Sequence, residues 1–331
     1  MARLALRSPQ FKYKQIPVSG VNSAICQITI DTVVRYTLVK NTKKNTTINF
    51  DISELARDYL DIYFTINYVP QEIAITTTIT NYSGFNGTGS PVGSATTFVD
   101  TGYEGYGYFE ENTNPTLPTS GYLISKNTVE DEVQLYLPAI QPGFSEGTKV
   151  PQIVGGSINV VNVSGSATSI GGNYSSKIYR INCTKYGNGR KIIFINKYGV
   201  QQDLWFFLKE VTSLNRTNEK YQSNTIQYPD DEYAQYEINN APNKLFNTQG
   251  KQMHTLSSGY YPEYTNQFFE QLLLSEYVWM TRPKKENPSA DETVPVTVKT
   301  SSMKFKTSVN DKLIEYTIDF EEAFDLINNI R

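Results

Sequence analysis

The sequence predicts a mainly β protein: β-sandwich domains with a long loop and hairpin insertion, few short helices, and a C-terminal α+β unit. Residues that favour half-buried strands are abundant, since the 331 residues include 24 Tyr and 16 Phe. Short apolar runs alternate with polar residues, and Gly, Pro and Asn separate these runs as turns do. A chain of this length is expected to form about two or three domains.

Residues 1–21 are predicted to form a basic N-terminal arm. The first part of this segment, residues 1–14, contains four basic residues and no acidic one. Two of these basic residues, Arg3 and Arg7, are candidate contacts with an acidic neighbouring surface. The alternative is a terminal tail that is surrounded by water.

Residues 22–80 and 175–214 are predicted to form a β-sandwich. In the first segment Cys26 and Ile28 alternate with polar residues, which is typical of a strand with one wet face. Cys26 is therefore expected to be a small core residue. The N-terminus has no apolar run of the kind found in secretory signals, so Cys26 and Cys183 are both expected to be reduced.

A short helix and two further strands are predicted within the first sandwich segment. Asp51 followed three residues later by Glu54 matches a capping box, so we expect a helix over residues 52–60. Strands are expected over residues 62–68 and 72–80, because a proline separates two runs that are rich in aromatic and β-branched residues.

The second sandwich segment contains the strongest strand patterns of the sequence. Residues 191–196 and 203–208 are apolar on both faces and flank a turn-like segment, residues 197–199. These features predict a hairpin that lies centrally between layers. A further strand is expected over residues 178–183.

Residues 81–174 differ in composition from the rest of the chain. They contain two basic against eight acidic residues, a net charge of −6, so the remainder carries +3. Gly, Ser, Thr and Asn dominate, and a stretch of this kind buries little apolar surface. The segment is therefore predicted to be a loop and hairpin insertion that the sandwich presents.

The rest of the chain is predicted to be a connector followed by a C-terminal α+β domain. Residues 215–252 are polar and rich in Asn and Gln, which favours an extended connector. The domain covers residues 253–331, where an apolar stripe predicts a helix over residues 265–280. Residues 314–320 alternate cleanly between apolar and polar, as a strand does. Further strands are expected over residues 294–300 and 303–307, and a short helix over residues 321–330.

No residue pattern supports catalysis, and no cofactor or metal site is predicted. His254 is the only imidazole, so a Ser-His-Asp triad would depend on it, and no Gly-x-Ser-x-Gly elbow is present. The acids at 110–111 and 230–232 would serve glycoside hydrolysis only if two carboxyls faced each other across a cleft. Adjacent acids in a sequence more often hydrate a loop. The phosphate-binding Gly-x-x-x-x-Gly-Lys-Ser/Thr motif is absent.

The aromatic segment at residues 103–109 is the best candidate for an interaction surface. Glycine spacers leave the rings of Tyr103, Tyr106, Tyr108 and Phe109 free to project. Tyrosine is an economical contact residue because it offers a large rigid ring at little entropic cost. The alternative is a hairpin whose aromatic face packs on its own sandwich.

Charge and hydropathy argue against two classes of partner. The net charge is −3, so there is no basic excess to bind nucleic acid through bulk charge. The sequence has no run of about 20 apolar residues, so no membrane-spanning helix is expected.

Four stretches of the sequence, taken together, resemble one class of proteins. They are residues 50–60 (FDISELARDYL), 105–111 (GYGYFEE), 194–207 (FINKYGVQQDLWFF) and 309–320 (VNDKLIEYTIDF). In this order they resemble virion structural proteins of tailed bacteriophages, often from marine hosts. The resemblance spans most of the chain.

The resemblance implies a non-enzymatic structural component of the virion, in the tail or its end, baseplate or fibre-adaptor region. The implied partners are other copies of the chain and other virion proteins, and the implied location is the virion, after synthesis in the host cytoplasm. No catalytic residue is carried over. A long polar insertion and a basic arm agree with contacts between subunits. A second hypothesis is a host-recognition protein whose tyrosines bind a surface glycan, and a third is a glycan-degrading enzyme.

Overall fold

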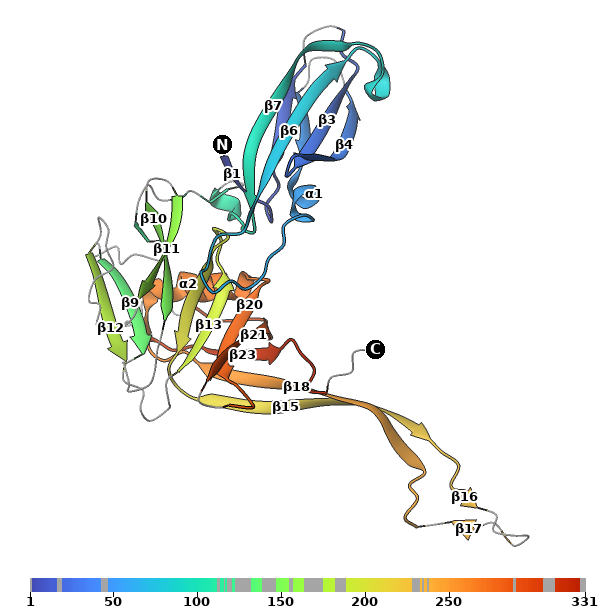
Figure 1. Cartoon of the computed structure of the whole chain (residues 1–331), viewed down its shortest axis with the longest axis vertical. Coiled ribbons are helices and arrows are strands. Elements are labelled where there is room, and N and C mark those ends of the chain that lie inside the picture. The colour runs from blue at the N-terminus through green and yellow to red at the C-terminus, as the bar shows by residue number, and fades with distance from the viewer. Residues whose placement is uncertain are drawn as a thin grey trace.

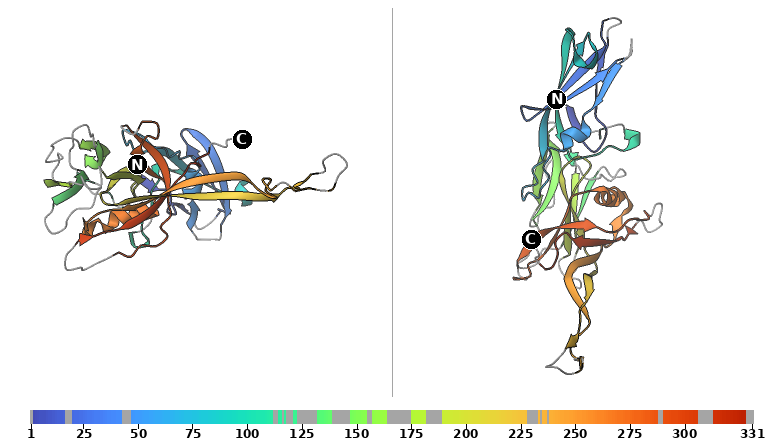
Figure 2. Two further views of the ribbon diagram at one scale, coloured as in Figure 1. Left: turned by 90° about the horizontal axis from the view of Figure 1, so that it is seen from below. Right: turned by 90° about the vertical axis from the view of Figure 1, so that its right-hand side faces the viewer.

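The computed structural model of this chain is an elongated, mainly β molecule, as the sequence predicts (Figure 1). A five-stranded sheet lies at one end and a seven-stranded sheet in the middle, and a two-stranded ribbon projects beyond the second sheet (Figure 2). The structure describes residues 2–16, 20–42, 47–111, 114–115, 117, 121–122, 132–138, 147–154, 157–163, 175–181, 189–227, 233, 235–236, 238–287, 290–305 and 313–327.

The N-terminal β-sandwich packs a five-stranded sheet against a two-stranded sheet and a helix. Its core forms because buried residues alternate with polar ones: Ile28 and Ile75 of the larger sheet share one buried cluster with Phe50 of the two-stranded sheet. The sheet order is β1 (Ala2–Ala5), β7 (Pro91–Tyr103), β6 (Glu72–Tyr82), β3 (Ser23–Ile30) and β4 (Val33–Asn41). The other elements are β2 (Phe11–Gln15), β5 (Thr47–Asp51) and α1 (Ser53–Arg57).

Cys26 lies inside this core, as the alternation along its strand predicts. Its side chain is fully buried in β3 and forms no disulfide. Burial raises the pKa of the Cys26 thiol to about 11, against a smaller opposing effect of Lys40, so the thiol stays protonated near neutral pH. Cys183 lies outside the described residues.

The predicted helix over residues 52–60 is shorter than expected, because α1 covers only Ser53–Arg57. Asp51 does not cap it as a capping box would. Instead, its Oδ1 accepts hydrogen bonds from the backbone N–H (3.1 Å) and the hydroxyl (2.7 Å) of Ser53. The strand predicted over residues 62–68 does not form. Tyr68 has a positive φ of 55°, and its ring and that of Phe64 pack against the second sheet.

The seven-stranded sheet forms the middle of the molecule, and α2 (Asn266–Leu274) packs on it. Phe269 and Leu272 of this helix share a buried cluster with Phe206 and Phe320 of the sheet. The sheet order is β14 (Gln201–Phe206), β13 (Arg190–Ile195), β20 (Val278–Pro283), β21 (Asp291–Val298), β23 (Thr317–Glu322), β18 (Asn243–Ser257) and β15 (Glu210–Gln222).

The predicted hairpin around residues 197–199 is confirmed, since β13 and β14 pair in antiparallel register. Both strands are mostly buried on both faces. However, β14 ends the sheet and is not central. A further layer covers it: Leu137 and Val150, from other strands, share the buried cluster of Leu204.

The structure differs from the predicted grouping of residues 22–80 with 175–214. Strand β6 pairs with β7, which belongs to the predicted insertion over residues 81–174. Strands β13 and β14 instead join the C-terminal strands through β20. The physical reason is local: β6 and β7 are neighbours in sequence and close an antiparallel hairpin, so they need no distant partner.

The second half of the predicted helix over residues 265–280 is a strand instead. α2 ends at Leu274, Ser275 is extended, and Val278–Met280 begin β20. Val278, Trp279 and Met280 are all buried. Three consecutive buried side chains fit a strand that is covered on both faces, whereas a surface helix would turn one of them to water.

The alternation predicted over residues 314–320 is confirmed on its core face. Ile314, Tyr316, Ile318 and Phe320 are all buried. The helix predicted over residues 321–330 does not form in the described part, because β23 continues to Glu322 and residues 323–327 are non-helical. The strand predicted over residues 294–300 is β21, and described residues 303–305 form no strand.

Smaller sheets and helical turns complete the described fold. One sheet orders β11 (Ser157–Val163), β10 (Thr148–Val154) and β8 (Gly121–Tyr122), and β9 (Glu132–Pro138) pairs with β12 (Ser175–Ile181) in parallel. Two short pairs are β16 (Ile226–Gln227) with β17 (Gln235–Tyr236), and β19 (Tyr261–Pro262) with β22 (Leu313–Ile314). The turns are η1 (Phe85–Gly87), η2 (Phe109–Glu111) and η3 (Glu263–Thr265).

Candidate functional site

A two-stranded arm extends from the seven-stranded sheet into solvent (Figures 1 and 2). It consists of β15 and β18, which pair in antiparallel register from Glu210–Leu256 to Gln222–Asn243. Strand β18 meets β23 only over residues 253–257. We call residues 211–222 and 243–252 the shaft of the arm, and residues 223–242 its tip. The shaft has no third strand paired to it among the described residues.

The arm exposes apolar side chains along its length. On the shaft, Leu214 is 60% exposed, and Tyr221 packs only edge to face on Phe246, with 5.6 Å between the ring centroids. At the tip, Tyr233 and Ile238 are 92% and 98% exposed. A lone two-stranded ribbon is marginally stable in water because it buries no core. The exposed surface of the arm is therefore suited to being covered by another molecule.

The arm differs from the extended connector predicted over residues 215–252. Most residues of the shaft are polar and its apolar residues are irregularly spaced, so no period-two pattern marks its strands. A bulge also shifts its register between Thr217 and Glu219, opposite Asn247 with a φ of 49°. The available signal was the pair of aromatic and apolar runs that flank the Pro- and Asn-rich tip.

The root of the arm is held by a row of charged side chains, one from each of several neighbouring strands. His254 Nδ1 lies 2.9 Å from Glu210 Oε1, and its Nε2 lies 3.1 Å from Glu322 Oε1. Arg190 Nε donates to Glu210 (2.7 Å), and Arg282 pairs with Glu322. Arg282 Nε also donates to Glu292, at 3.0 Å. We call this row the ionic ladder.

The ionic ladder favours a charged imidazole. Burial opposes protonation of His254, but the hydrogen bonds and charges of Glu210 and Glu322 outweigh it and raise its pKa. Burial also acts against ionisation of Glu210 and Glu322, yet the bond to His254 lowers the pKa of each. The imidazole is buried between these partners. Both ring nitrogens are engaged, so neither is available to a substrate.

The tyrosines predicted to project freely are packed instead. Tyr103 is buried, with the guanidinium of Arg3 4.1 Å above its ring. Tyr106 and Tyr108 meet edge to face, with centroids 5.8 Å apart, and both are half-buried. Of the four predicted residues, Phe109 is fully exposed. The alternative prediction, a hairpin that packs its aromatic face on its own sandwich, is correct only in that the three tyrosines pack within the chain: residues 104–108 form no strand, and Tyr108 packs beside Lys197 of the β13–β14 turn.

Arg3 and Arg7 do contact acidic residues, but these belong to the same chain. Strand β1 pairs in parallel with β7, so residues 2–5 are part of the sheet and not a free arm. Arg3 Nη2 lies 2.5 Å from Glu72 Oε1. Arg7 lies 3.7 Å from Glu104 and 3.3 Å from Glu276. The acidic partners predicted for these arginines on a neighbouring surface are therefore residues of the same chain.

Arg7 belongs to a charged cluster that joins the sandwich to the second sheet. Arg57, at the end of α1, donates two hydrogen bonds to Glu104, of 3.0 and 2.8 Å, and also pairs with Glu276 beside β20. Burial raises the pKa of Glu104 despite the opposing effect of Arg57. We call Arg7, Arg57, Glu104 and Glu276 the junction cluster.

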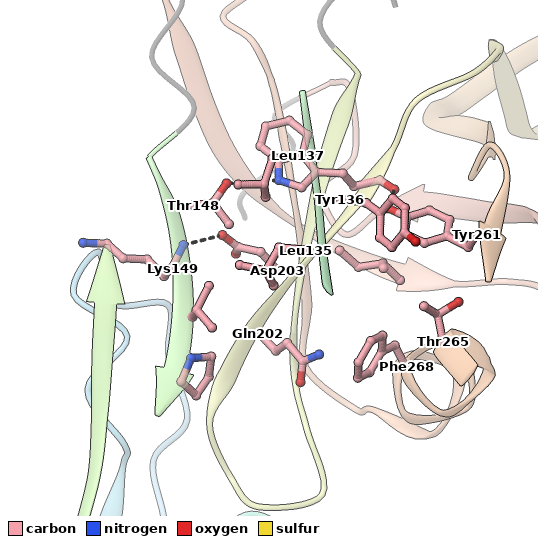
Figure 3. A pocket seen from close by; sticks show the side chains of 14 residues that line it. Leu135, Tyr136, Leu137, Thr148, Lys149, Gln202, Asp203, Tyr261, Thr265 and Phe268 are labelled. Atoms are coloured by element: carbon pink, nitrogen blue, oxygen red, sulfur yellow. Dashed lines mark hydrogen bonds between the residues drawn. The ribbon is translucent and has the colours of Figure 1, made fainter. Parts of the chain in front are cut away.

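A pocket of about 510 Å³, open mouth included, lies between β9, β10, β14 and α2 (Figure 3). Its walls are mainly apolar, and Tyr136, Tyr261 and Phe268 line one side. Asp203 is the acid among the lining residues. It accepts a hydrogen bond from the backbone N–H of Lys149 (2.9 Å) and another from the hydroxyl of Tyr68. Burial raises the pKa of Asp203.

The pocket lacks the pair of carboxyls that glycoside hydrolysis requires, as far as its described lining residues go. Both oxygens of Asp203 already have partners within the chain. Of the acids predicted from the sequence, Glu110 is exposed to solvent, and residues 230–232 lie outside the described residues. The described geometry therefore assembles no catalytic centre in this pocket.

No helix among the described residues has the length and apolarity that a membrane span requires. No group of three or more His, Cys, Asp and Glu side chains among them is arranged to hold a metal ion.

Compared with protein-family models, curated proteins and solved structures, the chain has no significant match.

Proposed function

We propose that this chain is a non-enzymatic structural subunit of a tailed-phage virion, in the tail or its end region. It acts through contacts between subunits, and the arm makes these contacts. The observation that carries the proposal is the arm itself, which exposes Leu214, Tyr221, Tyr233 and Ile238 on a ribbon with no core. The resemblance of the sequence to virion proteins supplies the location.

In the isolated chain, the apolar side chains of the arm are exposed to water. Burying a large apolar side chain fully contributes roughly 1.5–3 kcal/mol, and the isolated molecule does not gain much of that energy. A partner that covers the ribbon would supply it. Exposed apolar surface on a projecting element is typical of proteins that assemble.

The body of the molecule is suited to hold such an arm in a fixed direction. The ionic ladder ties Glu210 of β15 and His254 of β18, which lie at the root of the arm, to other strands of the sheet. Paired charges such as these, buried at His254 and Glu322, favour one arrangement of the elements they join. A rigid root lets a subunit present its arm at a defined angle to a neighbour.

The glycan-recognition hypothesis has less support. It needs tyrosine rings at a free tip, whereas Tyr103 is buried and Tyr106 and Tyr108 pack beside Arg7 and Lys197.

The proposal is tested on purified particles from a culture that produces this chain. Mass spectrometry is expected to find the chain as a particle component. Amine cross-linking is expected to join Lys220, Lys244 or Lys251 of the shaft to a neighbouring subunit. Lys284, an exposed lysine outside the arm, serves as the comparison site. The proposal is wrong if the chain is found only outside particles. It is also wrong if the shaft lysines cross-link only within their own chain.

A further inference from the structure

We infer that the pocket between β9, β10, β14 and α2 binds a small uncharged aromatic molecule, and that Gln202 donates a hydrogen bond to an acceptor of that molecule. None of the described lining residues belongs to the arm, so this site is independent of the proposed structural function. Two features support it: a buried amide whose donor faces the pocket, and the aromatic walls around that amide (Figure 3).

The amide of Gln202 is held in one orientation by its neighbour Asn196. Asn196 Oδ1 accepts hydrogen bonds from the backbone N–H groups of Tyr198 (3.0 Å) and Val200 (3.1 Å). Asn196 Nδ2 is therefore left to donate to Gln202 Oε1, at 3.1 Å. Turning the Asn196 amide over would set its NH₂ group against two N–H donors, so neither amide can be reversed.

This orientation leaves Gln202 Nε2 as a donor on the side of the pocket, turned toward Phe268 of α2 (Figure 3). The residue is 2% exposed, and no described residue supplies an acceptor for this nitrogen. The hydroxyls of Tyr261 and Thr265 also line the pocket, but each donates to a backbone carbonyl at 2.6 Å. Buried polar groups are nearly always paired, so an acceptor on a ligand would complete the amide.

The walls of the pocket are suited to an aromatic body. Tyr136 and Tyr261 meet edge to face, with ring centroids 5.4 Å apart, and Phe268 lies on the same side. Leu135 and Leu204 add aliphatic surface. Aromatic rings favour edge-to-face and offset contacts with one another. The volume of about 510 Å³, open mouth included, lies within the range of small-molecule sites, roughly 300–1,000 Å³.

The pocket disfavours a charged ligand of either sign. Asp203 is in its wall, so an anion would lie beside another carboxyl group. A cation would find that carboxyl already engaged, because its oxygens accept hydrogen bonds from Tyr68 and from the backbone of Lys149, and Lys191 Nζ lies 3.9 Å away. Mainly apolar walls do not replace the water that a charged group loses. The ligand is therefore neutral, with an acceptor such as a carbonyl oxygen.

The test uses the full-length chain and acetophenone, an aromatic ketone that accepts a hydrogen bond and donates none. Acetophenone is expected to bind with a dissociation constant of about 1 mM or below, which is typical of a ligand of this size. Toluene has the ring but no acceptor, and it is expected to bind at least about tenfold more weakly. Benzoate and benzylamine, which carry opposite charges, are expected to bind more weakly by a similar factor.

The two tryptophans of the chain supply a reporter and an internal reference. Trp205 lines the pocket, and its indole N–H donates to Thr148 Oγ1 at 3.2 Å. Trp279 does not line the pocket, and its ring packs on that of Phe64. In the nuclear magnetic resonance spectrum of the ¹⁵N-labelled chain, acetophenone is expected to shift the indole signal of Trp205 and not that of Trp279. Trp205→Phe assigns the two signals.

The Gln202→Glu substitution removes the donor and keeps the oxygen that Asn196 requires. It is expected to weaken acetophenone binding at least about tenfold and to leave toluene binding nearly unchanged. Gln201→Glu is the matched control, because Gln201 is adjacent, is 3% exposed and does not line the pocket. This control keeps the oxygen that accepts the hydroxyl of Thr65, and it is expected to bind acetophenone as the wild type does.

A second variant, Leu135→Trp, fills the pocket from β9 and is expected to abolish the binding of both acetophenone and toluene. Thermal unfolding of each variant checks that the chain is folded. If Gln202→Glu does not fold, Leu135→Trp and the comparison of acetophenone with toluene on the wild type decide the question. If no probe binds the wild type, the pocket holds ordered water only and the inference is overturned. Acetophenone that binds no more tightly than toluene, or binding that is insensitive to Gln202→Glu, also overturns it.

Discussion

The imidazole of His254 lies between two carboxylates that are 44 and 68 residues away in the sequence. Its neighbours on the strand, Met253 and Thr255, give no indication of this environment. Burial disfavours a charged imidazole, yet Glu210 and Glu322 reverse that preference and raise its pKa. The residue therefore acts as a bridge between strands.

This arrangement predicts a particular pH dependence of stability. The raised pKa of His254 gives stability that is complete below its unfolded value of 6.5 and is lost as pH rises through the folded pKa. The lowered pKa values of Glu210 and Glu322 give stability that is present above 4.5 and is lost as pH falls through their folded pKa values. The contribution of the ladder is thus largest between these two limits.

The measurement is the free energy of urea unfolding of wild type and His254→Gln from pH 4 to 9. The variant is expected to be less stable by about 2 kcal/mol between pH 4.5 and 6.5, with the difference shrinking at alkaline pH. His254 is the only histidine in the chain, so a change near neutral pH in the wild type is readily assigned. A wild type that gains stability relative to the variant above pH 6.5 would contradict the assignment.

The β13–β14 hairpin shows how a single turn residue fixes an element against its neighbours. Gly199 has a φ of 77° and donates its N–H to the carbonyl of Asn196 (2.9 Å). A Cβ at this position would lie 2.6 Å from Tyr103 Cδ2 and 2.9 Å from the carbonyl oxygen of Glu104. The turn is therefore closed both by its backbone conformation and by contact with the end of β7.

The Gly199→Ala substitution is expected to lower the free energy of unfolding by about 2 kcal/mol or more. Roughly 1 kcal/mol comes from the positive φ, and the remainder from the clash with Tyr103 and Glu104. Gly93→Ala is the matched control, because its φ is 74° and a Cβ there meets nothing within 4 Å. Chemical denaturation measures both variants. Equal losses in the two would show that the contact with β7 does not matter.

At the scale of the whole molecule, the sandwich and the second sheet are joined by contacts of several kinds. The junction cluster supplies charge pairs, and the rings of Phe64 and Trp279 meet with centroids 5.9 Å apart. Thr65 Oγ1 also donates to Gln201 Oε1, at 2.6 Å. Because these contacts are partly buried and differ in kind, the two parts should unfold together.

The junction is tested by a double-mutant cycle on Arg57 and Glu104. Arg57→Ala leaves the buried Glu104 with Arg7 at 3.7 Å, so we expect a loss of about 3 kcal/mol. Arg57→Ala combined with Glu104→Gln should cost less than the sum of the single changes. Lys299→Ala, at the more exposed pair with Glu321 (3.3 Å), is the control and should cost less than about 1 kcal/mol. Additive losses would rule out coupling across the junction.

Local sequence patterns are sufficient to predict the strand-rich class and several elements. Alternation placed Cys26 and Ile318 in cores, and two apolar runs around Gly199 specified a hairpin. These features depend on the period of side chains along one strand and on turn residues, which are local properties of the chain. The same local signals could identify residues 103–109 as aromatic but not whether the rings were free.

The tertiary structure alone decided which strands pair, where α2 ends, and what covers each side chain. The apolar run Val278–Met280 fits either a helix or a strand, and pairing with β13 selected the strand. The polar sequence of the arm predicts a connector, because a ribbon that packs on no core needs no regular apolar face. The junction cluster and the ionic ladder bring together charges from distant segments. Such contacts depend on how the sheets pack against each other. They join segments that are far apart in the sequence, so local sequence patterns do not predict them.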